Sequence, residues 1–139
     1  MAQTRYTNFP NGVKTFHRDS NSAVDSTTAY TVETNAGDIL GRTIIMDSAS
    51  AKTVTMPLIA GTADGAIVTI VNGEDGVLLT VDPNNVDGIN FGDQVADGVT
   101  VVNTAATAKK GDYITLATVS SASTYWSVVG IGGIWAVGA

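Results

Sequence analysis

Short runs in which apolar and polar residues alternate, bounded by glycine, aspartate and asparagine, limit most strongly how this chain can fold. Threonine alternates with apolar residues in 54–56, 68–70, 79–81 and 113–116. A period of two is typical of a half-buried β-strand, because successive side chains point to opposite faces of a sheet. The pattern therefore predicts antiparallel strands that each present one face to a core.

The rest of the chain also predicts an all-β protein. No segment of ten or more residues has apolar residues at helical spacing behind a capping box, so no α-helix of ordinary length is expected. Turn residues between the runs predict tight hairpins. The expected fold is a small antiparallel β-sandwich or β-roll, with strands at 30–33, 39–47, 53–56, 66–72, 77–81, 99–103, 113–119, 125–129 and 134–137.

Residues 1–28 differ from the rest and are predicted to form an extended N-terminal arm, with the β-sandwich body in 29–139. The arm is rich in turn and loop residues and has no sustained periodicity. A segment this short has no core of its own, so its apolar residues are expected to pack against this body, a neighbouring copy or a different protein. These residues are Tyr6, Phe9, Val13 and Phe16.

Charge is divided unevenly along the chain. Arg5, Lys14 and Arg18 lie in the first 18 residues, which contain no acidic residue, whereas the remaining 121 carry 13 acidic and four basic residues, a net charge of −9. A basic terminus on an acidic body is typical of an arm that docks on an acidic partner or on nucleic acid. A solvated tail is the alternative interpretation.

The residue sets that catalysis and metal binding require are missing, so no enzyme activity, cofactor or metal site is predicted. The chain has no cysteine, and His17 is its only histidine, which leaves no nucleophile triad and no zinc site. Asp87, Asp93 and Asp97 lie beside glycines in turns, so they are expected to bond to their own backbone and not to act as a glycosidase acid in an apolar pocket. The oxygen-rich segment 82–88 departs from a calcium-binding loop.

Neither nucleic acid nor a membrane is an expected partner. The body is acidic and lacks the basic stripe with aromatic platforms that binds nucleic acid. The first residues lack the apolar segment of a signal peptide, and glycines interrupt the apolar C-terminal run. Trp126 and Trp135 are expected to be core residues, and stacking on the sugar rings of a glycan is the alternative.

The C-terminal run is more apolar than one exposed sheet edge allows. A body of about a hundred residues has a thin core, so oligomerisation is predicted. The glycines at 130–133 predict a bulge or a tight bend in this run. Residues assigned to the subunit interface or core are Trp126, Val128, Ile131, Ile134 and Trp135.

Two segments resemble proteins of bacteriophage particles. Residues 5–13 read Arg-Tyr-Thr-Asn-Phe-Pro-Asn-Gly-Val and resemble the R-[FY]-T-N-F-P-N-G-V start of virion proteins of tailed bacteriophages, especially those of marine bacteria. Residues 52–135 resemble the small β domains of phage head-decoration and fibre proteins. That likeness rests on a strand ending in Met-Pro at 56–57, I-V-N at 70–72, L-T-V at 79–81 and Y-W-S-V-V-G at 125–130.

The resemblance implies a homotrimeric virion protein that is synthesised in the host cytoplasm and placed on the outer capsid surface. One alternative is a capsid decoration (cement) protein that binds the major capsid protein and stabilises the head. The other is a tail- or head-fibre, receptor-binding β domain that contacts host surface glycans. A single arm and the absence of a long repetitive shaft favour the cement protein. The capsid-binding arm residues that it implies are Arg5, Tyr6, Phe9, Lys14, Phe16 and Arg18.

Overall fold

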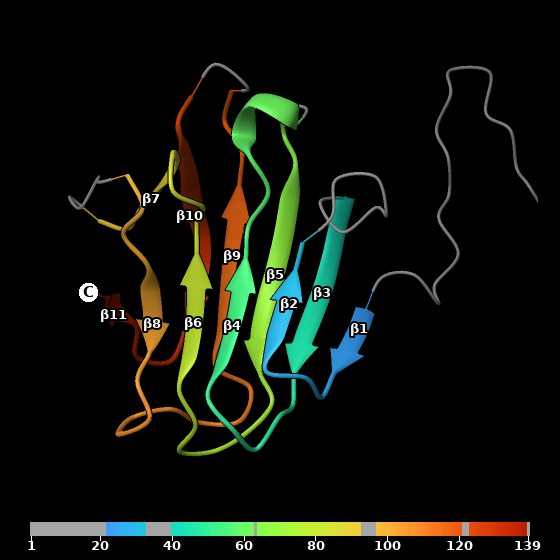
Figure 1. Ribbon diagram of the computed structural model, residues 1–139, viewed down its shortest axis with the longest axis vertical. Helices are drawn as coiled ribbons and strands as arrows, with labels where there is room; N and C mark the ends of the chain where they lie inside the picture. The colour runs from blue at the N-terminus through green and yellow to red at the C-terminus, as the bar shows by residue number, and fades with distance from the viewer. Residues whose placement is uncertain (1–21, 33–39, 63, 93–96, 121–122, 139) are drawn as a thin grey trace, which may run out of the picture.

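The computed structural model describes residues 22–32, 40–62, 64–92, 97–120 and 123–138, which form two layered β-sheets (Figure 1). The prediction of an all-β protein is confirmed, because the only helical segment among these residues is a 3-10 turn, η2 (Ile59–Gly61). Sheet A contains, in spatial order, β1 (Ser22–Asp25), β3 (Leu40–Met46), β5 (Ile67–Asn72), β9 (Tyr113–Ala117), β10 (Tyr125–Gly132) and β7 (Gly88–Asn90). Sheet B contains β11 (Ala136–Val137), β8 (Val101–Asn103), β6 (Leu79–Asp82), β4 (Lys52–Thr55) and β2 (Ala29–Thr31).

The expectation of antiparallel strands is wrong for the first half of the chain. Strands β1, β3 and β5 are parallel neighbours in sheet A, and β2, β4 and β6 are parallel neighbours in sheet B. The reason is that β1, β3 and β5 of sheet A are each followed by a strand of sheet B. Strands that are consecutive in the chain therefore do not pair as hairpins, and those that do pair run in the same direction. Each such A–B couple is called a rung here.

The second half of the chain adds antiparallel strands to the three rungs. β9 pairs with β5 and β10, and β8 pairs with β6 and β11, all antiparallel. β7 lies parallel to β10 at the edge of sheet A. The predicted bulge is confirmed, since the register of β10 against β9 shifts between Val128 and Gly130.

Strand β1 lies inside the segment that the sequence assigned to the arm. It pairs along its whole length with β3, from Ser22 opposite Thr43 to Asp25 opposite Met46. Residues 22–28 therefore belong to the first rung of the body, and the division at residue 28 falls within that rung. Residues 1–21 lie outside the described part of the chain.

The core lies between the two sheets and takes every second side chain from the long strands. In β5, for example, Val68 and Ile70 are buried while Ile67, Thr69 and Val71 are half-buried on the outside. Each large apolar side chain that is removed from water contributes about 1.5–3 kcal/mol. The completely buried core residues are Ile44, Met46, Val54, Ile59, Val68, Ile70, Leu79, Val81, Ile114, Leu116 and Trp126.

Candidate interaction surface

The outer side of sheet A carries a broad face without a charged residue, which we call the sheet A face. It consists of the outward side chains of β1, β3, β5, β9 and β10, and those that the structure describes are half-buried or exposed. Interface centres are depleted of charge in the same way. Among the described side chains, the members of the face are Val24, Thr43, Ile45, Ile67, Thr69, Val71, Tyr113, Thr115, Ala117, Tyr125 and Ser127.

Strand register arranges these side chains in rows that run across the sheet. One row is apolar, with Val24, Ile45, Val71 and Tyr113 on four neighbouring strands. The next row consists of threonines, Thr43, Thr69 and Thr115. The hydroxyls of Thr69 and Thr115 are 2.9 Å apart and hydrogen-bonded. β-Branched side chains in register pack closely on a pleated surface, so the face is regular as well as uncharged.

The Tyr113 ring lies on the glycines of the neighbouring strand β10. A Cβ atom placed on Gly132 would lie 2.8 Å from Cδ1 of Tyr113, and one on Gly130 would lie 3.8 Å from its Cε2. An aromatic ring over strand glycines fills the space that their missing side chains leave. Tyr113 therefore extends the apolar row across β10, and 38% of its surface remains exposed.

The outer face of sheet B has a different composition. Its outward side chains are small or hydroxylated, and Asp82 adds a carboxylate at the end of β6. Aliphatic and aromatic side chains are thus more numerous on the sheet A face. The remaining outward residues of sheet B are Ala29, Thr31, Thr53, Thr55, Thr80, Val102 and Ala136.

The five residues that the sequence assigned to an interface or core fall into two groups. Trp126 is completely buried and Trp135 is 8% exposed, and both belong to the core together with the partly buried Val128. Ile131 and Ile134 are 43% and 60% exposed. Neither indole ring is open for stacking on a sugar, and the ring nitrogen of Trp135 donates to the Gly132 carbonyl at 3.0 Å.

The predicted capsid-binding residues Arg5, Tyr6, Phe9, Lys14, Phe16 and Arg18 lie outside the described residues. The sheet A face, in contrast, was missed by the sequence analysis. Its apolar row draws on positions that are up to 89 residues apart in the chain, and only the strand register brings them together.

A cluster of buried amides and a carboxylate joins the two sheets at one end. The Asn72 side-chain amide in β5 donates to Asn103 Oδ1 in β8 at 2.7 Å and to the Val77 carbonyl at 2.8 Å. Asn103 Nδ2 in turn donates to Asp112 Oδ2 and to the Ile134 carbonyl, both at 2.9 Å. Both asparagines are fully buried. Because these polar groups bond one another, the cluster is a structural lock and holds no free reactive group.

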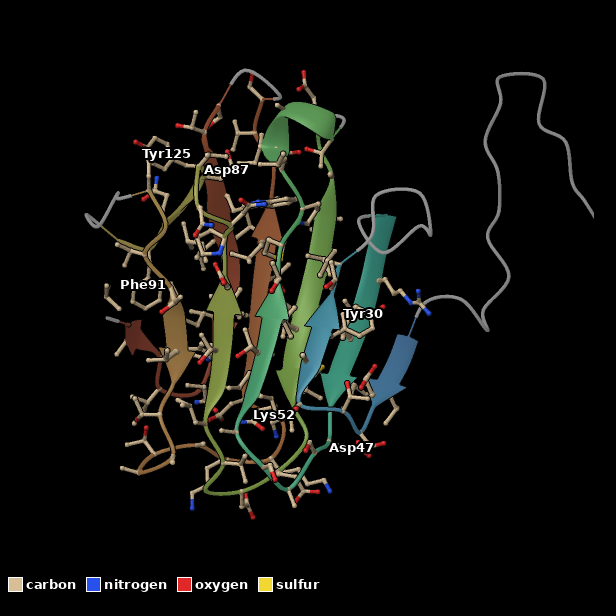
Figure 2. All side chains as sticks on the ribbon, viewed as in Figure 1. Tyr30, Asp47, Lys52, Asp87, Phe91 and Tyr125 are labelled. Carbon is tan, nitrogen blue, oxygen red and sulfur yellow. The ribbon has the colours of Figure 1, made fainter. Side chains whose placement is uncertain are left out.

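Asp87 has a structural role at the opposite end. Its side chain is 4% exposed, and Oδ2 accepts the Ile59 N–H at 2.9 Å, which fixes the start of η2 (Figure 2). Its backbone carbonyl accepts the Gly98 N–H at 2.9 Å. Asp87 thus has a structural role, but its side chain bonds to the backbone of a distant segment, whereas the sequence predicts a bond to its own backbone. Asp97 is exposed, and Asp93 lies outside the described residues.

Lys52 is the most deeply buried cation that the structure describes, with 1% of its surface exposed. Its ammonium group donates to the Ser48 carbonyl at 3.1 Å, in the region where Figure 2 labels Asp47. Burial lowers the pKa of Lys52, and the charges of Glu74 and Asp47 oppose this change. A lysine with a lowered pKa is a potential nucleophile, but this one has almost no exposed surface through which to reach a substrate.

The lowered pKa of Lys52 predicts a distinctive pH dependence of stability. Below its unfolded pKa of 10.5, the unfolded chain binds more protons at this residue than the folded protein, so stability rises with pH from the lowered pKa up to 10.5. We expect the free energy of unfolding of the wild type, relative to the Lys52→Met variant, to increase over this interval and then level off. Urea denaturation at a series of pH values measures it.

The exposed Lys110 supplies the control for this measurement. The difference in free energy of unfolding between the wild type and Lys110→Met should not rise with pH over this interval. Near pH 7, Lys52→Met should be as stable as the wild type or more stable, because removing a buried charge removes its desolvation cost. Parallel pH profiles of Lys52→Met and the wild type would show that burial does not lower this pKa.

Three further observations bear on function. The described part of the chain contains no group of three or more histidine, cysteine, aspartate or glutamate side chains placed to hold a metal ion. Within the same residues, no helix has the length and apolar character needed to cross a membrane. Comparisons with protein-family models, with curated proteins and with solved structures found no match.

Proposed function

We propose that this protein is a capsid decoration protein of a tailed bacteriophage, which binds the outer surface of the head as a homotrimer and stabilises it. The observation that carries the proposal is the sheet A face, a broad surface of apolar and threonine side chains on an acidic body. An uncharged face of this kind is suited to burial between copies of the chain, which supports the homotrimer in this proposal. The phage-like start at residues 5–13 supplies the class of particle.

The body and the arm have separate tasks in this proposal. The body presents the arm on a packed core, in which the buried asparagines and Asp112 bond one another across the two sheets. The arm reaches the major capsid protein, with Tyr6, Phe9 and Phe16 in apolar contacts and the basic residues Arg5, Lys14 and Arg18 on acidic groups. Three arms on one trimer bind about 10² to 10⁴ times more tightly than a single arm, which gives the particle resistance to the pressure of packaged DNA.

Binding to undecorated capsids of its own phage tests the proposal. We expect full-length protein to bind saturably and to raise the temperature at which the capsids rupture. Deletion of residues 1–18 should weaken the binding by about 100-fold or more, because it removes all the arm contacts. The double variant Lys109→Ala/Lys110→Ala is a matched control, since it removes two exposed basic residues of the body and should bind like the wild type.

Two results would contradict the proposal. The first is a folded full-length protein that does not bind the capsids. The second is binding that is unchanged when residues 1–18 are absent, which would remove the assigned role of the arm. Binding to host surface glycans in place of capsids would support the receptor-binding fibre domain.

A further inference from the structure

We infer that the sheet A face is the surface through which copies of this chain contact one another. The inference rests on the proposed homotrimer, and it assigns the occupant of a face that the described strands and turns of one copy leave uncovered. Its members are half-buried or exposed, and the register gives the face an apolar row next to a threonine row.

Charge favours this face over the acidic turns as the contact between copies. Residues 19–139 have a net charge of −9, so two bodies repel each other wherever their acidic turns meet. The acidic residues of the described part lie at strand ends and in turns, and none belongs to the sheet A face. Contact through this face therefore keeps most acidic turns of neighbouring copies apart, and only Asp47, which directly follows β3, lies at its border. The acidic residues of the described part are Asp25, Asp47, Asp64, Glu74, Asp75, Asp82, Asp87, Asp97 and Asp112.

The shape of the face is also suited to packing against the same face of the other two copies around a threefold axis. Sheets pack about 10 Å apart when the side chains of their facing surfaces interdigitate. The rows of β-branched residues provide ridges for such packing, and the Tyr113 ring covers the glycines that would otherwise leave a hollow. Thr69 in β5 lies near the centre, between Ile67 and Val71 along its strand and between Thr43 and Thr115 across the sheet.

A single charge at the centre of this face tests the inference. Thr69→Glu would place a carboxylate among side chains that are buried on association, which is unfavourable without a partner. We expect it to raise the dissociation constant of the oligomer, measured by sedimentation equilibrium, by about 100-fold or more. Thr80→Glu is the matched control, because Thr80 is a half-buried, outward-facing threonine on the equivalent strand of sheet B. It should associate like the wild type.

Two more variants separate an effect on association from an effect on folding. Thr69→Lys should dissociate the oligomer as well, since a charge of either sign is unpaired there, whereas Thr69→Val removes the hydroxyl bonded to Thr115 and should still associate. Circular dichroism checks that each variant is folded. A monomeric wild type at micromolar concentration, wild-type association of Thr69→Glu and Thr69→Lys, or dissociation by Thr80→Glu alone would overturn the inference.

These outcomes are separate from those of the capsid experiment. A wild type that associates through the sheet A face but fails to bind capsids would contradict the proposed function and leave the interface assignment intact. If the wild type binds capsids, and Thr69→Glu forms the same oligomer and binds equally well, the proposed function is supported. The assignment of the interface to the sheet A face is then overturned.

Discussion

Replacement of Gly73 by alanine is expected to lower the free energy of unfolding by about 3 kcal/mol or more. A Cβ atom at this position would lie 2.8 Å from the Cα and Cβ atoms of Asp47 and 2.8 Å from the Met46 carbonyl oxygen. Gly73 is buried, and its own N–H donates to that carbonyl at 2.8 Å. The contact is largely between two backbones, so no rotation of a side chain relieves it.

The contact lies where two neighbouring rungs meet. β3 ends at Met46 and β5, its parallel neighbour in sheet A, ends at Asn72, so Asp47 and Gly73 directly follow the two strands. To admit a methyl group, the two strand ends must move apart, which weakens the backbone pairing of Met46 with Asn72. The parallel stacking of the rungs is thus the reason that this position requires glycine.

Thermal and urea denaturation of Gly73→Ala and Gly111→Ala measure this effect with a control. Gly111 has a φ of +95° and open space around its missing side chain, so alanine there costs only about 1–2 kcal/mol for the left-handed backbone. For a domain of this size, the Gly73 variant should melt about 10 °C or more below the wild type. Equal losses for the two variants would show that the backbone contact is unimportant.

The local features of the fold were predictable from the sequence. Alternation correctly assigned Val54 and Val68 to the core side and Thr55 and Thr69 to the outside, because side-chain direction depends only on position along the strand. Strand pairing was not predictable in this way. A half-buried strand shows the same alternation whether its neighbour is parallel or antiparallel. The alternating order of the two sheets along the chain from β1 to β8 could therefore not be recognised from the spacing of apolar residues.

The interaction surface depends on the same missing information. Ile45, Val71 and Tyr113 form a row only because β3, β5 and β9 are adjacent, and each residue alone is an ordinary outward side chain. Short strands were also missed, since β7 contains only three residues, one of them glycine. The prediction that residues 1–18 bind the capsid rests on their basic and aromatic composition. Deletion of these residues tests it.

Replacement of Asn103 by leucine is expected to destabilise the protein by about 2–5 kcal/mol, because it removes the residue that links both parts of the buried polar cluster. Asn72 loses its bond to Asn103 but still donates to the Val77 carbonyl. Asp112 also loses its bond to Asn103 but still accepts the Lys109 N–H. The Ile134 carbonyl loses the bond from Asn103. Each buried polar group that is left without a partner costs about 1–3 kcal/mol.

The Asn103 variant should also loosen the C-terminal segment before the rest of the body. The bond from Asn103 to the Ile134 carbonyl holds the crossing from β10 to β11, next to the core residue Trp135. Hydrogen exchange of the backbone amides near β11 should therefore accelerate more than exchange in β5.

An exposed asparagine provides the control for the size of the effect. Asn85→Leu should change the free energy of unfolding by no more than about 0.5 kcal/mol. The double variant Asn72→Leu/Asn103→Leu should lose less than the sum of the two single variants, because residues in one hydrogen-bond network are coupled. Additive losses, or a loss below about 1 kcal/mol for Asn103→Leu, would mean that the cluster does not lock the two sheets together.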